Sequence, residues 1–245
     1  DVFPFVNLQM LIGKHLGMKW IVNNLIEKQD PRTIKLYNEI LDIVENGDEY
    51  FDIKAIYKFF PARRKAGKRK DDFKIEILSD DLSTVLETFD FPRQKYGQYL
   101  SLNDYVSPEG IDYIGFFVAT AGEKSRLVSN ELKEKGEFYR GHIVNSIGLE
   151  LAEATSEYIH KMMRQDVGII DKNISLNEIL NAQYQGNRYS FGYPACPDLS
   201  DQRKLFNLLK PERYGITLTE EFMMYPEATV SAIVFSQPFC KYFNM

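Results

Sequence analysis

Apolar residues recur at helical spacing between about residues 139 and 163, and this stripe is the strongest pattern in the chain. Its members are Ile143, Val144, Ile147, Leu151, Ala154, Thr155, Tyr158 and Met162. Residues three and four apart share one helix face, so the stripe predicts a long amphipathic helix packed on a core. A shorter helix is predicted to begin at Pro31, and residues 7–27 are predicted to be helical with an interruption at Gly13 and Gly17.

Strands are indicated where apolar residues alternate or run together. Residues 52–60 and 73–78 alternate as strands do, and residues 85–91 form a third candidate. The runs 111–120 and 228–235 are typical of strands buried on both faces. A basic run joins the first two strands, and it consists of Arg63, Arg64, Lys65, Lys68, Arg69 and Lys70. We therefore predict a hairpin that carries this basic run at a solvated tip.

Helices and strands mix along the chain without a regular alternation of strand and helix. The predicted fold class is therefore α+β, with a mostly antiparallel twisted sheet, one long amphipathic helix and several shorter helices. No repeat and no Gly/Ser/Pro-rich linker divides the chain, so we expect a single domain over residues 1–245. The first residues, 1–4, resemble neither a signal peptide nor an initiator methionine, and we expect the chain to be the C-terminal part of a longer protein.

Composition narrows the class of partner. The formal net charge is -5 and neither half of the chain is basic, which argues against a dedicated nucleic-acid-binding protein. Two cysteines are too few for a disulfide scaffold, so we expect a reducing compartment. No segment approaches the roughly 20 apolar residues of a membrane-spanning helix, so we expect no membrane partner.

No self-sufficient catalytic or metal site is recognisable in the sequence. Glycine-rich phosphate loops of the GxGxxG and GxxxxGK[ST] types are missing, as is a GxSxG nucleophile motif. The three histidines, His15, His142 and His160, form no metal-ligand spacing. We therefore predict no catalytic residue and no metal ligand within this chain.

The side of the long helix opposite its apolar stripe has an unusual composition. Glu153 projects there at 100° per residue, close on the helical wheel to His142, Ser146, Leu149 and His160. A solvated face is usually rich in Lys and Glu, whereas this face carries two histidines and a leucine. Both a solvated face and the wall of a cleft remain open from the periodicity alone.

Residues 184–198 contain two glycines, two prolines and four aromatic residues, which excludes a regular helix or a central strand. An irregular stretch of this length in a compact domain is often functional. Arg188 within it could offer a bidentate fork to a carboxylate or a phosphate, or could be a structural arginine that ties the loop down.

The segment from Arg188 through Gly192 and Tyr193 to Asp198 resembles the RxxxGYPACP signature of the activation domain of cobalamin-dependent methionine synthase. Similar matches recur in order along nearly the whole chain. They include the segments 3–11, 13–17, 112–115, 120–122, 151–154, 157–160, 218–220, 226–231 and 241–243. The chain is thus similar to this family over almost its full length.

The resemblance implies a function within a larger, cytoplasmic methyltransferase. Such a domain binds S-adenosylmethionine, docks on the neighbouring domain that holds cobalamin, and supports reductive methylation of cob(II)alamin with an electron from a flavodoxin-type reductant. The whole enzyme methylates homocysteine from methyltetrahydrofolate, and the isolated domain is not expected to do so. The cobalt is the nucleophile on this reading, so the domain needs no general base.

The resemblance also implies a set of S-adenosylmethionine-binding residues: Asn7, Glu153, Arg188, Gly192, Tyr193, Tyr242 and Phe243. Arg188 is implied to bind the ligand carboxylate and Glu153 its ammonium or sulfonium charge. Gly192 and Tyr193 belong to the receiving loop, and the aromatic pair lies near the sulfonium.

Three positions depart from the family pattern: Asn7 replaces an Asp, Phe243 a tyrosine, and Leu149 an acidic residue of some members. Asn7 and Phe243 leave open an alternative, a module that docks on a corrinoid protein without useful S-adenosylmethionine binding. A free-standing methyltransferase is disfavoured because no acceptor-activating base is recognisable.

Overall fold

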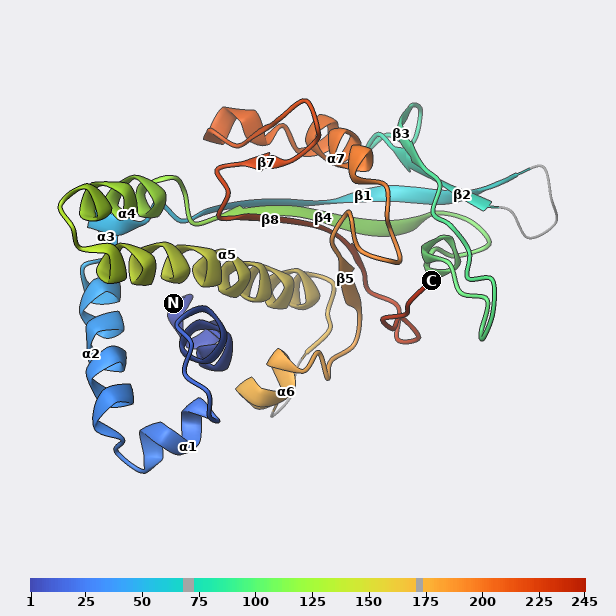
Figure 1. Ribbon diagram of the computed structural model, residues 1–245. Helices are drawn as coiled ribbons and strands as arrows, with labels where there is room; N and C mark the ends of the chain where they lie inside the picture. The colour runs from blue at the N-terminus through green and yellow to red at the C-terminus, as the bar shows by residue number, and fades with distance from the viewer. Residues whose placement is uncertain (68–72, 171–173) are drawn as a thin grey trace. The chain divides into compact units, whose positions relative to one another are not determined.

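The computed structural model describes residues 1–67, 73–170 and 174–245. Its six-stranded sheet has the strand order β3-β2-β1-β4-β8-β5, and β6 and β7 form a separate pair (Figure 1). The strands are β1 (Lys54–Ala66), β2 (Phe73–Leu78), β3 (Val85–Phe89), β4 (Asp112–Thr120), β5 (Asn187–Tyr189), β6 (Thr217–Leu218), β7 (Met224–Tyr225) and β8 (Thr229–Phe235). The pairs β1/β2, β2/β3 and β5/β8 are antiparallel. Together with the helices, this sheet confirms the predicted α+β class.

The described helices include one of 29 residues, as the apolar stripe predicted. They are α1 (Val22–Glu27), α2 (Pro31–Glu45), α3 (Gly47–Tyr50), α4 (Lys124–Glu134), α5 (Phe138–Asp166), α6 (Leu176–Leu180) and α7 (Gln202–Leu209). Short 3₁₀ turns occur at Phe3–Phe5, Leu102–Tyr105, Leu199–Asp201 and Pro211–Tyr214. Among the described residues, no helix joins the length and the apolar character that crossing a membrane requires.

Helix α2 begins where the sequence predicted, at Pro31. Proline suits the first helical position because that residue's amide has no partner within the helix. The preceding residue, Asp30, caps the helix, since its carboxylate accepts a hydrogen bond of 2.9 Å from the Thr33 amide. The helical prediction for residues 7–27 is confirmed in two pieces, a π-helix over Gln9–His15 and then α1, with the predicted interruption at Gly17, where φ is +77°. The predicted interruption at Gly13 was wrong, because Gly13 lies inside the π-helix.

The predicted strand end at residue 60 was wrong, because β1 continues to Ala66 and pairs with β2. Charge neutralisation between β1 and β2 explains why β1 extends beyond residue 60. Arg63 and Lys65, two residues apart on one strand face, bind Glu76 at 2.8 Å and 2.7 Å. Between them, Arg64 donates hydrogen bonds of 2.6 Å to two backbone carbonyls. The first half of the basic run therefore lies within β1 and not at a hairpin tip, while Arg63 and Lys65 are exposed, as predicted. Lys68, Arg69 and Lys70 lie outside the described residues.

Two compact units make up the chain, each assembled from separate segments. The first comprises residues 1–55, 119–158 and 225–230, and the second residues 56–118, 159–224 and 231–245. Each unit has its own cluster of buried apolar side chains. The prediction of a single domain over residues 1–245 stays a prediction.

Helices α4 and α5 approach each other closely in the first unit. Gly148 and Gly141, seven residues apart on α5, lie against Ser125 and Ser129 of α4. Both serines are buried, and a Cβ atom at either glycine would overlap the partner residue. Small residues at these four positions let the two helices approach closely, which fixes the face that residues 138–158 of α5 present to the rest of the first unit.

In the second unit the sheet and the end of α5 form the core. The Phe89 ring at the end of β3 stacks 5.7 Å from Phe91, two residues further along the chain, and 5.5 Å from Phe116 of β4. Gly115 of β4 has no side chain, which leaves room for Met163 from the last turns of α5. This packing positions residues 159–166, whose side chains contact the segment around β5.

Candidate functional site

Arg188 lies in β5, the edge strand that pairs with β8 opposite Val234. The sequence had excluded a central strand in this segment, and a three-residue edge strand agrees with that exclusion. The guanidinium is half-buried, and its Nη1 donates to the Tyr184 hydroxyl at 3.1 Å and lies 3.5 Å from Nδ1 of His160. Arg188 therefore offers a guanidinium of fixed position at the edge of the sheet.

A tight loop follows β5 and carries Gly192 and Tyr193. Gly192 has φ of +89°, a conformation that L side chains rarely adopt, and its amide donates to the Cys196 carbonyl at 2.9 Å. The Cys196 amide donates back to the Tyr193 carbonyl at 3.0 Å, so the loop closes on itself. This closure leaves the Tyr193 side chain 66% exposed. The loop presents an open glycine backbone beside a solvent-facing aromatic ring.

The cysteine in this loop is not an activated nucleophile. Cys196 is buried and its thiol donates to the Ser190 carbonyl at 2.9 Å. Burial, with the nearby charge of Asp201, raises the pKa of Cys196 to about 12, so the thiol stays protonated at neutral pH. The same holds for Cys240, whose pKa burial also raises to about 12.

The C-terminal aromatic pair packs on two tyrosines of the second unit, Tyr189 in β5 and Tyr105 in a 3₁₀ turn. The Tyr242 ring lies 5.4 Å from Tyr189, and the Phe243 ring lies 6.4 Å from Tyr105. The hydroxyls of Tyr189 and Tyr105 both donate to the Lys241 carbonyl, at 2.8 Å and 3.1 Å. These bonds hold the end of the chain in place. Tyr242 remains exposed, whereas Phe243 is half-buried.

The two other predicted site residues belong to the first unit. Glu153 is exposed on α5. Asn7 is half-buried at the start of the π-helix, where its side-chain oxygen accepts a hydrogen bond of 3.2 Å from the Met10 amide. An aspartate could accept the same bond, so this contact does not require asparagine.

The face of α5 opposite its apolar stripe is mixed, not uniformly solvated. His142 and Glu153 are exposed and Leu149 is half-buried, while Ser146 and His160 are buried. The interpretation of this face as solvent-exposed is therefore wrong at Ser146 and His160. The helical wheel gives the direction of a side chain but does not tell which segment of the chain covers it.

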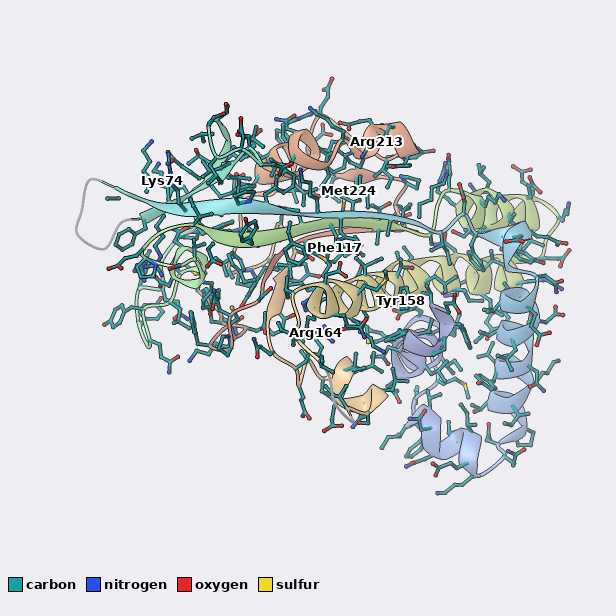
Figure 2. All side chains as sticks on the ribbon, turned by 180° about the vertical axis from the view of Figure 1, so that it is seen from behind. Lys74, Phe117, Tyr158, Arg164, Arg213 and Met224 are labelled. Atoms are coloured by element: carbon teal, nitrogen blue, oxygen red, sulfur yellow. The ribbon has the colours of Figure 1, made fainter. Side chains whose placement is uncertain are left out.

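The sequence did not single out two residues beside Arg188, namely Tyr184 and Arg164. The Arg164 guanidinium lies 3.8 Å from the centre of the Tyr184 ring, and Figure 2 shows Arg164 in the last turns of α5. The sequence could have indicated Arg164, because it follows His160 by four residues and residues at this spacing share a helix face. The sequence also gave no indication of the pair formed by His15 and Glu150, whose imidazole and carboxylate lie 3.0 Å apart.

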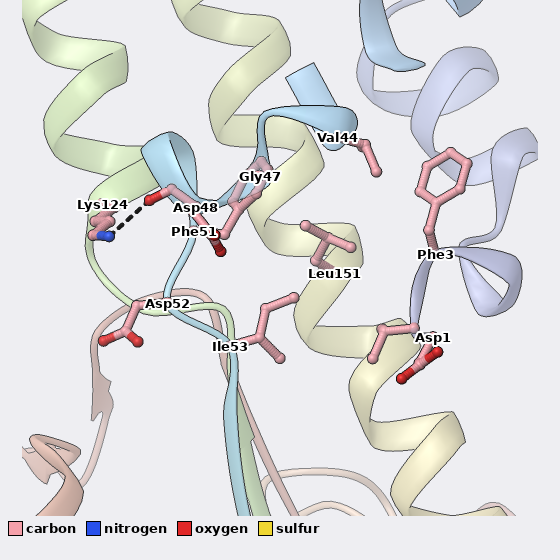
Figure 3. Close-up of a pocket in the computed structure, with 11 residues that line it drawn as sticks. Asp1, Phe3, Val44, Gly47, Asp48, Phe51, Asp52, Ile53, Lys124 and Leu151 are labelled. Atoms are coloured by element: carbon pink, nitrogen blue, oxygen red, sulfur yellow. Dashed lines mark hydrogen bonds between the residues drawn. The ribbon is translucent and has the colours of Figure 1, made fainter. Parts of the chain in front are cut away.

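A cavity of about 510 Å³ lies in the first unit (Figure 3). Its lining residues are Asp1, Val2, Phe3, Val44, Gly47, Asp48, Phe51, Asp52, Ile53, Lys124 and Leu151. The Lys124 ammonium donates to the Asp48 carbonyl at 2.8 Å at its edge. None of the predicted site residues lines this cavity. Glu153 follows Leu151 by two residues, about 200° around the helix, and so points away from it.

Among the residues that the structure describes, no group of three or more His, Cys, Asp or Glu side chains could hold a metal ion. Each unit by itself offers polar or aromatic groups. In the second unit, Arg188 is a cation suited to a carboxylate, and Tyr193 and Tyr242 are exposed rings. In the first unit, Glu153 is an exposed anion.

Comparison with known proteins gives consistent matches. A family model described as "Vitamin B12 dependent methionine synthase, activation domain" matches residues 4–245. Methionine synthase of Mycobacterium tuberculosis is 33% identical over 208 residues, which cover 78% of this chain and 17% of that protein. The enzyme of Mycobacterium leprae is 31% identical over the same shares. The chain thus spans less than a fifth of the length of these relatives.

A solved structure is similar in fold along the whole chain. The crystal structure of the MetH reactivation domain bound to AdoHcy matches with a TM-score of 0.87 and 26% sequence identity. The match covers 99% of this chain and 77% of the other. Both compact units therefore have counterparts in that structure.

Proposed function

Because the chain belongs to the family of vitamin B12 dependent methionine synthase activation domains, we propose that it binds S-adenosylmethionine and docks on the cobalamin-binding domain of a methionine synthase. In that position it serves the reductive methylation of cob(II)alamin and so reactivates an enzyme that methylates homocysteine from methyltetrahydrofolate. The family resemblance found in the sequence is confirmed by the family match, while this activity is our proposal.

The observation that supports the proposal best is the likeness to a reactivation domain bound to AdoHcy over 99% of the chain. AdoHcy is the product that S-adenosylmethionine becomes when it gives up its methyl group. The methyl group leaves the sulfonium, the bonding electron pair stays on sulfur, and a neutral thioether remains. A domain that binds the product's adenosine, carboxylate and ammonium groups can bind the donor through the same groups.

In the second unit we propose that Arg188 binds the ligand carboxylate. Its guanidinium is half-buried, and a charge-assisted bidentate contact is strongest where water is partly excluded. Gly192 allows the ligand to approach the backbone, and Tyr193 extends the same loop. Tyr242 and Phe243 supply aromatic faces for the sulfonium, a cation–π contact of about 0.5–2 kcal/mol.

In the first unit we propose that Glu153 attracts the ammonium or sulfonium charge, since its carboxylate is exposed. Asn7 is proposed to contact the ligand through its amide, because its side-chain oxygen is already occupied by the Met10 amide. The asparagine therefore contributes a neutral contact in place of a charged one.

Cobalamin, held by the neighbouring domain, supplies the nucleophilic cobalt that takes the methyl group. This chain holds and orients the methyl donor and needs no base of its own. We further propose a flavodoxin-type reductant as the electron source and the cytoplasm as the location. The purified chain alone is expected not to methylate homocysteine.

Calorimetric titration of the chain with AdoHcy and with S-adenosylmethionine tests the proposal. We expect saturable binding of both ligands. The alternative is a module that docks on a corrinoid protein without useful ligand binding, and it predicts no saturable heat at millimolar ligand. That result would overturn the proposed function.

A further inference from the structure

Four side chains of the second unit form one cluster beside β5: His160 and Arg164 from α5, and Tyr184 and Arg188 from the segment that includes β5. The Arg164 guanidinium stacks 3.8 Å from the centre of the Tyr184 ring. The His160 ring meets the same tyrosine edge-on, with ring centres 5.1 Å apart and planes at 79°. The Tyr184 ring is thus fixed by a cation on one side and an imidazole on another.

Tyr184 and His160 both contact the same nitrogen atom of Arg188. Nη1 of Arg188 donates to the Tyr184 hydroxyl at 3.1 Å and lies 3.5 Å from Nδ1 of His160. A guanidinium is planar, so fixing one nitrogen from two directions also fixes the directions of the other N–H groups. Two side chains that are themselves held by packing therefore help to orient Arg188.

His160 is suited to this contact only as a neutral imidazole. It is 0% exposed, and burial followed by the charges of Arg188 and Arg164 holds its pKa well below the usual value. An unprotonated Nδ1 accepts a hydrogen bond from Arg188, which places the ring proton on Nε2. Among the described residues Nε2 has no hydrogen-bond partner, so the hydrogen-bonding contact of this ring is the one with Arg188.

We propose that Tyr184 and His160 are positioning residues for Arg188, which hold its guanidinium in the orientation that a ligand carboxylate requires. The inference rests on the proposed function, in which Arg188 binds the carboxylate of S-adenosylmethionine or AdoHcy. A long arginine side chain that is already ordered loses less rotamer freedom on binding, so these two residues raise affinity without touching the ligand.

The substitution Tyr184→Phe tests this role, because it removes the hydroxyl and keeps the ring between Arg164 and His160. Binding is measured calorimetrically with AdoHcy and with 5′-methylthioadenosine, which has the adenosine and the sulfur but no carboxylate. We expect Tyr184→Phe to weaken AdoHcy binding by about 5- to 20-fold and 5′-methylthioadenosine binding by less than about twofold. Equal losses for the two ligands would overturn the inference.

A matched control is Tyr57→Phe, which also removes a tyrosine hydroxyl from the second unit, one that donates to Asp166 at 2.8 Å. This variant should bind both ligands like the wild type. A double-mutant cycle isolates the coupling: in an Arg188→Ala background, Tyr184→Phe should cause no further loss of AdoHcy affinity. A persisting loss means that Tyr184 acts independently of Arg188, contrary to the inference.

His160 is tested by a pair of variants, because a buried histidine is sensitive to substitution. His160→Gln keeps an acceptor for Arg188 and should retain more of the preference for AdoHcy over 5′-methylthioadenosine than His160→Leu does. Equal preferences in the two variants would count against His160. Suppose that the wild type binds AdoHcy and that Arg188→Ala lowers the preference for AdoHcy over 5′-methylthioadenosine. A Tyr184→Phe variant that keeps the wild-type preference then overturns this inference but not the proposed function. A wild type that binds neither ligand overturns the proposed function as well.

Discussion

Nε2 of His15 lies 3.0 Å from Oε1 of Glu150, so an imidazole from the N-terminal segment is the partner of a buried carboxylate on α5. Burial raises the pKa of Glu150, and the hydrogen bond and charge of His15 lower it. Glu153 adds a smaller raising effect and Lys14 a smaller lowering one. The net direction is upward, so the folded state favours the protonated carboxyl.

The upward shift in the pKa of Glu150 determines how the stability of the variant His15→Ala depends on pH. A carboxyl whose pKa is raised by folding binds more protons in the native state, so the free energy of unfolding falls as pH rises through the window between the two pKa values. Without His15 the pKa of Glu150 rises further and the window widens. We expect a loss of about 1–3 kcal/mol at pH 8 and a smaller loss at pH 5, measured by urea denaturation.

The control for His15→Ala is the same substitution in a Glu150→Gln background. With no carboxylate to leave buried, the loss should no longer depend on pH. A loss of equal size at pH 5 and pH 8 in the wild-type background would show that His15 acts only through packing.

Arg188→Ala should weaken AdoHcy binding by about 2–4 kcal/mol, because a charge-assisted bidentate contact is lost. The fold should persist, since the backbone pairing of β5 with β8 does not involve the guanidinium. Calorimetry gives the affinity, and circular dichroism with the thermal midpoint gives the fold. Unchanged binding would refute the assignment of Arg188, and unfolding would make it a structural arginine.

Glu153→Gln should leave the thermal midpoint nearly unchanged, because the side chain is exposed and contributes no core packing. Binding of S-adenosylmethionine should weaken by about 1–3 kcal/mol, since the attraction of a carboxylate to a cationic ligand is removed. 5′-Methylthioadenosine carries neither the sulfonium nor the ammonium charge and should lose little. Equal losses for both ligands would mean that Glu153 shapes the site instead of supplying charge.

The sequence predicted the elements that a local pattern specifies. Helix α5 follows from its apolar stripe, and the start of α2 follows from Pro31 and its cap. The end of β1 was missed because the exposed Arg63 and Lys65 are typical of a loop until Glu76 is placed across from them. A pairing between strands distant along the chain is not visible in the charges of one strand alone.

The site was harder to predict for the same reason. Arg188 and Gly192 belong to a recognisable motif, whereas the contact of Tyr184 with Arg164 depends on how α5 packs beside β5. His15 and Glu150 are 135 residues apart, and nothing in the local sequence of either indicates the other. Long-range polar contacts of this kind are fixed by the fold and become visible only with it.

The contact between Gly148 and Ser125 gives a prediction in which two effects oppose each other. Alanine in place of a helical glycine stabilises an open helix by roughly 1 kcal/mol. At Gly148, however, a Cβ atom would lie 2.7 Å from the Ser125 Cβ, too close without a shift of α4 against α5. Overpacking of this kind costs about 1–3 kcal/mol, so Gly148→Ala should be net destabilising despite its better helix propensity.

The double variant Ser125→Gly with Gly148→Ala separates these two effects, because it moves the missing side chain from one helix to the other. Relative to Ser125→Gly alone, the added Gly148→Ala should be stabilising, since only the propensity term remains. Thermal and urea denaturation of the four proteins measure the cycle. If Gly148→Ala destabilised the chain equally in both backgrounds, the close approach of α4 and α5 at Ser125 would not be the cause of the destabilisation. The contact at Ser125 would then have to tolerate the extra methyl group.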